Sequence, residues 1–409
     1  MRPLDGVRIV EFGQFIAVPM AAAHLATLGA DVVKVEPLDG DPGRHSRFPG
    51  HLDRPSPYLM ACNQNKRSIA VDLKTDAGRE AVLRLIGRAD VVVENFRPGV
   101  LDRLGVGRDR VCAADSRLVH VSMTGYHPDS SLADRPAVDP IIQAASGMVA
   151  STGTVDGPPV KVGAAVVDHA AAHLVVEAVL TGLLVRGRTG EGTTVTLSLF
   201  DAALDLQAAH LTTYLVTGEQ PPRTGNGAPT NVPSDCFATR DGAVQVAAYA
   251  DRHWVAFCAA LGHSELAADL RFATRSDRIR NGAETVAEVA HLLAGRTTDE
   301  VLARLHAAGV MAARVADYAD VASAAHVRES GALGMTRGPD GRPYPALRSP
   351  LRDLAEAPVS TVVPALGEHT AAALAELGYP PAEVERLAGG GVILCGFEPE
   401  TAVNAELVI

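Results

Sequence analysis

Cysteine is scarce in this sequence, and its five residues are scattered. They are odd in number, none belongs to a C-x-x-C pair, and none has a histidine at metal-ligand spacing. A disulfide framework and a zinc site are therefore excluded as organising features, so we expect no metal centre and only buried free thiols. The cysteines are Cys62, Cys112, Cys236, Cys258 and Cys395.

Basic residues are also fewer than acidic ones. The chain has 37 lysines and arginines against 48 aspartates and glutamates, which gives a net charge of −11. Nucleic acids and anionic membranes call for a basic face, so we expect neither as a partner. No run of 18 apolar residues occurs, and Arg2, Pro3 and Asp5 do not resemble the start of a secretory leader. We therefore expect a cytoplasmic protein.

Several motifs of nucleotide and hydrolytic enzymes are missing. There is no G-x-x-x-x-G-K-[ST], and FGQFIAVP stands after the first expected strand in place of a G-x-G-x-x-G. Nor is there a G-x-S-x-G elbow or an H-E-x-x-H pair. These absences argue against P-loop, NAD-binding, serine-hydrolase and metalloprotease functions.

Apolar residues are abundant, at 47% of the 409 residues, and they fall into a recurring strand and helix pattern. A strand over 7–12, a helix over 19–28 and a strand over 31–36 open the chain as a βαβ unit. Continuous rather than alternating apolar strands indicate a parallel sheet covered on both faces. We expect a doubly wound α/β domain, with ligands beyond the carboxyl ends of its strands. Further strands are expected over 68–73, 90–95, 118–123 and 193–199, and helices over 76–88, 164–186 and 200–216.

A stretch rich in proline, glycine and asparagine, residues 217–233, is the best candidate for a linker between domains. It would separate a large domain over 1–216 from a smaller α+β domain over 234–330. Residues 331–409 would then return to the large domain, and we assign no role to the tail 391–409. In this part we expect a hairpin arm near 241–249, helices near 251–261, 283–294, 298–308 and 368–388, and a strand at 348–354.

Eight segments in order along the chain carry a family resemblance. They are PLDGVRIVEF, LGADVVKVEP, NKRSIAVDLKT, DVVVENFRPGVLDRLG, DRPAVDPIIQAASGM, VVDHAAA, RTGEGTTVTLSLFDAAL and PALGEHTAAALAELGY. Together they resemble the landmarks of the family III CoA-transferases, over about residues 3 to 388. That family includes formyl-CoA and carnitine CoA-transferases and, as a divergent branch, the α-methylacyl-CoA racemases. The resemblance implies a homodimer of interlocked rings that uses acyl-CoA and a carboxylic acid as substrates and has no tightly bound cofactor.

Asp168 lies inside the apolar run VGAAVVDHAAAH, where an unpaired carboxylate would be costly to bury. From the residues alone it is either the N-cap of a helix or a nucleophile. The resemblance implies the nucleophile. Asp168 would take the acyl group as a mixed anhydride, become an aspartyl-CoA thioester, and pass CoA to the acceptor acid. His169, about 100° round the same helix, is interpreted as structural.

The resemblance also implies a binding site for CoA and the acyl group. Residues 71–74 would hold the adenine end, residues 95–97 with Arg103 would hold the nucleotide and pantetheine parts, and Arg44 is a candidate for the 3′-phosphate. A polyanion such as CoA needs such cations and backbone donors. The full set of expected site residues is Ile16, Ala17, Arg44, Val71, Asp72, Leu73, Lys74, Asn95, Phe96, Arg97, Arg103, Ala137, Val138 and Asp139.

Two positions depart from the pattern of the formyl-CoA transferases. Ile16 and Val138 stand where those enzymes have a glutamine and a tyrosine, which argues against oxalate or formate and favours a more apolar acyl group or a dicarboxylate monoester. The racemase branch has a histidine at the place of Val138, and valine cannot move a proton. It also has a glutamate near 238–240, where ATR stands. Racemase-like enol chemistry and an inactive CoA-binding protein remain the alternatives.

Overall fold

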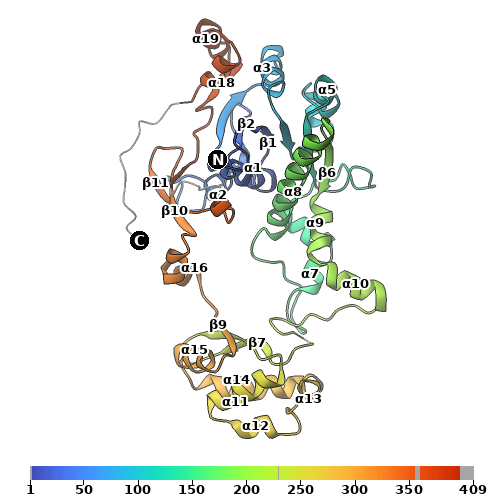
Figure 1. Cartoon of the computed structure of the whole chain (residues 1–409), viewed down its shortest axis with the longest axis vertical. Coiled ribbons are helices and arrows are strands. Elements are labelled where there is room, and N and C mark those ends of the chain that lie inside the picture. The colour runs from blue at the N-terminus through green and yellow to red at the C-terminus, as the bar shows by residue number, and fades with distance from the viewer. Residues whose placement is uncertain (1, 229, 355–359, 397–409) are drawn as a thin grey trace. The chain divides into compact units, whose positions relative to one another are not determined.

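The computed structural model describes residues 2–228, 230–354 and 360–396 (Figure 1). The chain forms two compact units. The large unit comprises Met1–Met148, Val162–Leu215 and Ala325–Ile409, and the small unit comprises Val149–Lys161 and Val216–Ala324. The stretch 217–233, expected as a linker, thus belongs to the small unit.

A seven-stranded sheet forms the centre of the large unit, in the order β13-β3-β2-β1-β4-β5-β6. All neighbouring pairs are parallel except β13 with β3. The predicted parallel sheet is therefore confirmed. Its strands are β1 (Arg8–Phe12), β2 (Asp31–Glu36), β3 (Arg67–Val71), β4 (Val91–Glu94), β5 (Val119–Thr124), β6 (Thr194–Ser198) and β13 (Ile393–Leu394).

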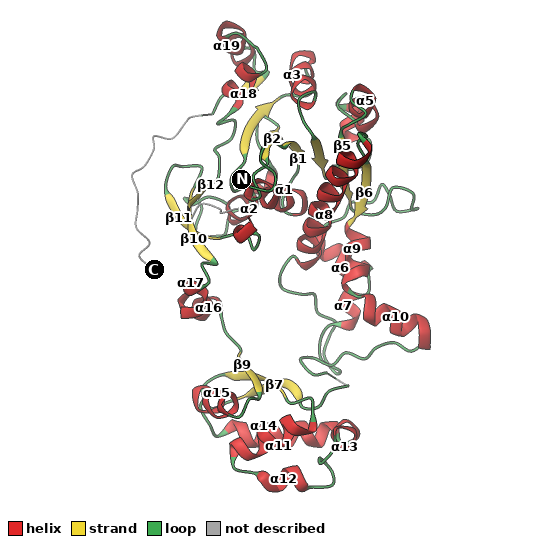
Figure 2. Ribbon diagram, viewed as in Figure 1, coloured by secondary structure: helices red, strands yellow, loops and turns green. Residues whose placement is uncertain are grey.

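Both faces of this sheet are apolar because alternate strand residues point to opposite sides. Val91 and Val93 join one core with helices α1 (Ala17–Thr27), α8 (Val166–Thr189) and α9 (Leu199–Leu206). Val92 joins the other core, with α3 (Asp76–Ile86), α18 (Thr370–Glu376) and α19 (Pro381–Gly389). Helices thus cover the two faces, as a doubly wound sheet requires (Figure 2).

Shorter elements complete the large unit. A second sheet, of order β11-β10-β12, combines β10 (Leu333–Arg337), β11 (Pro343–Leu347) and β12 (Ser360–Val362). Its other helices are η1 (Pro42–Arg44), α2 (Pro57–Cys62), α4 (Val100–Arg103), α5 (Arg108–Ala114), α6 (Asp139–Ala145), α17 (Ala325–Glu329) and η2 (Arg352–Leu354). Helices α7 (Met148–Ser151) and α10 (Ala208–Thr217) cross the boundary between the units.

The small unit is α+β. Its antiparallel sheet has the order β7-β8-β9, and Trp254, Phe257 and Phe272 are completely buried in its core. The segment Val149–Lys161 is tied to it by Arg223, whose guanidinium donates to the carbonyls of Thr154 and Gly157. The elements are β7 (Ser234–Ala238), β8 (Ala243–Ala247), β9 (Met311–Arg314), α11 (Asp251–Leu261), α12 (Ser264–Ala268), α13 (Arg275–Arg280), α14 (Gly282–Ala294), α15 (Thr298–Ala307) and α16 (Tyr318–Ser323).

Three expectations about local structure are wrong. The strand predicted at 348–354 is a turn followed by η2, and the strand lies just before it, at β11. The helix predicted over 200–216 is broken at Gln207 into α9 and α10. The cysteines are all free, but only Cys62 and Cys258 are buried. The end of the tail, 397–409, lies outside the described residues.

Helix α8 is the one described helix that is long and apolar enough, by length and composition, to cross a membrane. A helix in a protein core passes the same test. Here α8 packs on α1 and on strand β5, and Val167, Ala171, Val175 and Val179 are fully buried in the first core. This packing accounts for the buried face of α8, whereas Leu180 and Leu184 on the same helix are 38% and 55% exposed.

Candidate functional site

Asp168 lies in the first turn of α8, but it is not the cap of that helix. The N-cap position is Ala165, and no side chain at that position makes a capping hydrogen bond. The carboxylate of Asp139 takes over this role, because its Oδ2 accepts from the backbone N–H groups of Val167 (2.8 Å) and Asp168 (3.2 Å). The structure therefore removes the capping role that the sequence left open for Asp168.

Asp139 is itself held firmly. It is the first residue of α6, only 5% exposed, and its Oδ1 accepts a hydrogen bond from the Gln143 side-chain amide one turn later. The amide oxygen of Gln143 in turn accepts from the backbone N–H of Val162 (2.9 Å). This chain of contacts fixes the start of α8, and with it the backbone of Asp168.

The environment of Asp168 changes its acidity. Burial, and in second place the nearby charge of Asp139, raise the pKa of the Asp168 carboxyl to about 7. Burial disfavours the ionised form, and a second carboxylate disfavours it further. The ionised carboxylate of Asp168 is therefore a stronger base and nucleophile than a carboxylate in water.

Three histidines lie where α1 and α8 pack together. The rings of His24 and His173 are stacked, with centroids 5.6 Å apart, and His24 Nδ1 lies 3.0 Å from Ser349 Oγ. Burial lowers the pKa of His24 to about 4. His24, His169 and His173 line a largely apolar cleft of about 570 Å³ together with residues of α2 and β11. Asp168 does not line this cleft although His169, the next residue, does, and the structural role expected of His169 stays a prediction.

The loop that leaves β1 is fixed from two sides. Asn95, just after β4, accepts from the backbone N–H of Gln14 (2.8 Å) and donates to its carbonyl (3.0 Å). The N–H of Phe15, at φ 59°, donates to Asp41 Oδ1 (3.2 Å). The loop then enters α1 through Ile16 and Ala17, whose side chains are 9% and 3% exposed. Because β1 has β2 on one side and β4 on the other, this loop lies where a doubly wound sheet binds ligands.

A cluster of four buried charges supports this loop. Lys34 Nζ lies 3.0 Å from Glu11 Oε1 and 2.9 Å from Asp41 Oδ2, and it donates to the carbonyl of Gly13 (2.6 Å). Lys66 Nζ completes the cluster, 2.7 Å from Glu11 Oε2. Burial lowers the pKa of Lys66 to about 8, whereas the carboxylates around Lys34 more than offset burial and raise its pKa. Two cations and two anions thus hold the loop in place, and none of the four was predicted.

Arg44 lies in a buried ion pair, which argues against the expected contact with the 3′-phosphate of CoA. Its guanidinium donates to both carboxylate oxygens of Glu36, at 2.6 Å each, and to the carbonyl of Pro364 (3.1 Å). The residue is 8% exposed. With the Ser68 hydroxyl (3.4 Å), these contacts engage four of the five N–H donors of a guanidinium, and burial keeps the group away from a phosphate in solvent.

The other expected CoA residues lie at the carboxyl ends of β3 and β4. Val71 is the last residue of β3 and 1% exposed, and the turn after it is closed by the Lys74 N–H donating to Asp72 Oδ1 (2.9 Å). Leu73 and Phe96 are half-buried against the second core. Lys74, Arg97 and Arg103 are exposed and have no ion-pair partner within the described part of the chain. Three free cations therefore follow two parallel strands.

Glu94, beside these loops, was not predicted. It ends β4 and accepts from the backbone N–H of Phe96 (2.8 Å) and from the Ser122 hydroxyl, and burial raises its pKa to about 7. Ser122 lies opposite Glu94 because β4 pairs with β5. No local sequence pattern predicts that contact, since the two residues are far apart in the chain.

Ala137 and Val138 precede α6 and differ in exposure. Ala137 is half-buried and packs against Gly125. A Cβ at position 125 would clash with the Cβ of Ala137. Val138 is 58% exposed. Both side chains are apolar, so this edge of the site offers no hydrogen-bonding group from either of them.

Comparison with known proteins places the chain in a family. CoA-transferase family III matches residues 4–370. The chain belongs to CoA-transferase family III. The fold agrees, because a crystal structure of a CAIB/BAIF family protein from Brucella suis superposes with a TM-score of 0.83 at 35% identity, covering 92% of this chain and 99% of that one.

Relatives of this family III CoA-transferase have named activities of their own. A probable fatty acyl-CoA transferase of Mycobacterium tuberculosis is 35% identical, over 91% of this chain and 98% of its own length. A succinyl-CoA:glutarate CoA-transferase of Mus musculus is 33% identical, over 96% and 91%. An acetyl-CoA:oxalate CoA-transferase of Acetobacter aceti is 33% identical, over 81% and 85%. Within the described residues of the family III chain, no group of three or more histidine, cysteine, aspartate or glutamate side chains could hold a metal ion.

Proposed function

We propose that this chain transfers CoA from an acyl-CoA donor to a carboxylic acid acceptor, with Asp168 as the covalent nucleophile. The observation that carries the proposal is the pair formed by Asp139 and Asp168. Asp139 caps α8, so the Asp168 carboxyl is not needed to cap this helix. Its pKa of about 7 suits a group that must attack a thioester near neutral pH.

The reaction proceeds by two exchanges at Asp168. Its carboxylate oxygen attacks the thioester carbonyl, the C–S bond breaks, and CoA leaves as a thiolate with an acyl-aspartyl anhydride behind it. The thiolate then attacks the aspartyl carbonyl of the anhydride, which releases the donor acid as a carboxylate and leaves an aspartyl-CoA thioester. The acceptor carboxylate repeats these steps in reverse. Both intermediates keep the group activated, and partial burial limits their hydrolysis.

A trapping experiment tests this proposal. Incubation with a panel of acyl-CoA donors, followed by hydroxylamine, should convert Asp168 to a hydroxamate that peptide mass spectrometry locates, because only an activated aspartyl group reacts. A mixture with acceptor acids should also yield new acyl-CoA. Exchange of an α-proton with deuterated water, without trapping or transfer, would instead support a racemase. CoA binding with neither reaction would support an inactive binding protein.

The described residues give no support to the racemase alternative. Ala137 and Val138 carry no group that could move a proton, and no carboxylate stands in the segment 238–240, near which that branch has its glutamate. We further propose an apolar acyl group or a dicarboxylate monoester as the substrate, because Ile16 and Val138 bring no polar group to the site. A screen of donors against acceptors tests that preference.

We propose that CoA lies across the carboxyl ends of β3 and β4. The turn Asp72, Leu73 and Lys74 would contact the adenine end, and residues 95–97 with Arg103 would contact the phosphates and pantetheine. Ile16, Ala17, Ala137, Val138 and Asp139 would surround the reacting end. Exposed cations at the ends of parallel strands support this placement, and CoA is a substrate rather than a bound cofactor.

Arg103→Ala should weaken CoA binding about tenfold or more, because a charge-assisted contact to phosphate contributes roughly 1.5 to 3 kcal/mol. Isothermal titration calorimetry with CoA measures the effect. Arg84→Ala serves as the control, since Arg84 is an exposed arginine on α3 that pairs with Glu80. Equal affinities of the Arg103 variant and the wild type would remove Arg103 from the CoA site.

We also propose a cytoplasmic homodimer with interlocked chains. Helix α10 contains no buried residue, and Leu206 just before it and Leu215 and Val216 near its end are 45%, 71% and 78% exposed. Exposed apolar side chains grouped in this way are typical of a protein–protein interface, and a second copy of this chain would bury them. Because interlocked chains separate only by unfolding, the dimer should persist on dilution to nanomolar concentration in light-scattering or mass-photometry measurements. Reversible, folded monomers would overturn the interlocking.

A further inference from the structure

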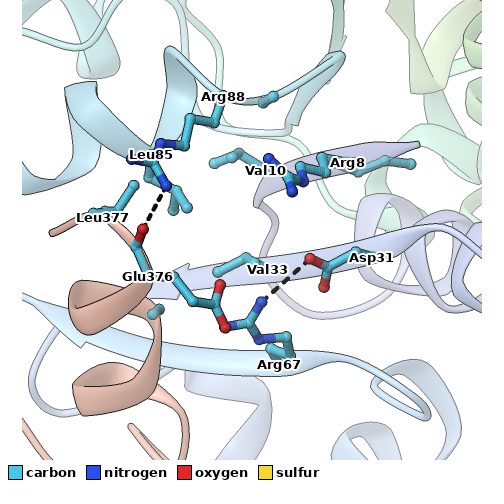
Figure 3. A pocket seen from close by; sticks show the side chains of 12 residues that line it. Arg8, Val10, Asp31, Val33, Arg67, Leu85, Arg88, Glu376 and Leu377 are labelled. Atoms are coloured by element: carbon cyan, nitrogen blue, oxygen red, sulfur yellow. Dashed lines mark hydrogen bonds and ion pairs between the residues drawn. The ribbon is translucent and has the colours of Figure 1, made fainter. Parts of the chain in front are cut away.

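A second cavity lies at the edge of the sheet opposite the carboxyl ends that carry the proposed CoA site. It has a volume of about 300 Å³ and opens where β1, β2 and β3 begin. Arg8, Asp31 and Arg67 are the first residues of these three strands, and all three line the cavity (Figure 3). The end of α3 and the end of α18 close it from the helical side.

The floor of this cavity is apolar. Val10 and Val33 come from the sheet, and Leu85, Ala373 and Leu377 come from the two helices that cover it (Figure 3). All of these except Leu85 and Leu377 are less than 5% exposed, so the floor belongs to the second core. An apolar group resting on it would be withdrawn from water, which is favourable in proportion to the area covered.

The rim of the cavity carries unbalanced positive charge. Of its three arginines only Arg67 is neutralised, by Asp31 (3.2 Å) and Glu376 (2.8 Å). Arg88 donates to the backbone carbonyl of Glu376, which carries no charge (Figure 3). The guanidinium of Arg8 has no hydrogen-bond or ion-pair partner among the residues that the structure describes. Three arginines against two carboxylates leave the rim with one excess positive charge.

We propose that this cavity binds a short-chain carboxylate, with its carboxylate on Arg8 and Arg88 and its alkyl chain on the floor of Val10 and Val33. Guanidinium groups bind carboxylates through two parallel hydrogen bonds, and Arg8 keeps all its donors for such a contact. The volume is near the lower limit for small-molecule sites, which suits a short chain rather than a nucleotide. The proposal does not depend on the transferase mechanism.

Calorimetry with sodium pentanoate, inorganic phosphate and pentan-1-ol tests the site. Wild-type protein should bind pentanoate more tightly than phosphate or the alcohol, because only pentanoate uses both rim and floor. Arg8→Ala should weaken pentanoate binding about tenfold or more. The fold should tolerate this change, because it is the backbone N–H of Arg8 that donates to Asp90. Arg84→Ala, on the same helix as Leu85 but outside the cavity, should bind pentanoate as the wild type does.

Location is tested separately, because a carboxylate could also enter the catalytic site as an acceptor. Crystals soaked in 4-bromobutyrate should show a bromine anomalous peak over Val10 and Val33, which should vanish in Arg8→Ala. A peak found only near Asp168, equal pentanoate affinity in Arg8→Ala, or equal binding of phosphate and pentanoate would each overturn the proposal. Transfer activity of Arg8→Ala stays at the wild-type level in every case, so failure here is distinct from failure of the proposed function.

Discussion

The Asp168→Asn variant should lose CoA transfer by several orders of magnitude and still bind CoA. The amide keeps the shape of the side chain, but it cannot form an anhydride with an acyl group. Since Asp139, and not Asp168, caps α8, the substitution should leave the helix intact. Asp168→Glu should also fail, because one added methylene displaces the carboxylate by roughly 1.5 Å from the attack geometry. Steady-state transfer assays and CoA calorimetry on the same samples measure both effects.

The matched control is Asp205→Asn, which changes an exposed aspartate on α9 in the same chemical way. It should transfer CoA as the wild type does. Mass spectrometry must exclude deamidation of the asparagine introduced by D168N, which would restore the nucleophile in part of the sample. Full activity in a D168N preparation free of aspartate at this position would show that the acyl group is never carried by this side chain, and the covalent mechanism would have to be abandoned.

Lys34→Met should lower the free energy of unfolding by about 3 to 5 kcal/mol. The substitution leaves the buried Asp41 carboxylate, 2% exposed, without a cation among the described residues, whereas Glu11 keeps its pair with Lys66 (2.7 Å). An uncompensated buried charge is far more costly than the loss of the pair itself. Urea or guanidinium denaturation followed by circular dichroism measures the change, with Lys74→Met as a control because Lys74 is exposed and has no ion-pair partner in the described residues.

A double variant sharpens this prediction. Removing the Asp41 charge as well, in Asp41→Asn with Lys34→Met, should destabilise the protein by less than the sum of the two single changes, because the remaining Glu11 and Lys66 still form a balanced pair. Transfer activity should fall in Lys34→Met at temperatures where the variant is folded, since the lysine also donates to Gly13 in the loop before Ile16. If Lys34→Met proved as stable as the wild type, the four groups of the buried cluster would not be ionised in the folded protein.

Much of the large unit could be predicted because its strands are short, apolar runs separated by helical patterns. The strand predicted at 348–354 failed for a physical reason. The real strand, β11, contains Pro343 and Pro345, and proline is expected only at the edge of a sheet because it cannot donate to a neighbour. Among the described strands, β11 lies at the edge of its sheet, next to β10. Sequence alone does not reveal which strands lie at an edge.

The candidate site also contains residues that the sequence could predict and residues that it could not. Asp168 could be singled out because an acid in an apolar run demands a reason, whereas excluding the capping role needed the position of Asp139. The charged cluster was missed because Lys34 lies in a run that is typical of an apolar strand, DVVKVE. Its partner Glu11 becomes visible only through the register of β1 on β2, in which Glu11 lies directly opposite Lys34. Such pairings depend on long-range strand alignment.

The small unit is built from two separate segments of the chain, and this limits how it can be transferred to another protein by recombination. The segment Val149–Lys161 joins Val216–Ala324 only in space, through the contacts of Arg223 and through the N–H of Gly225 donating to the carbonyl of Gly153 (2.8 Å). A gene fragment that spans 216–324 alone would encode this unit without the carbonyls that Arg223 binds. Recombination at a single pair of crossover points therefore cannot transplant the small unit without also carrying Val162–Leu215 of the large unit, and chimeras should be made with two inserted segments.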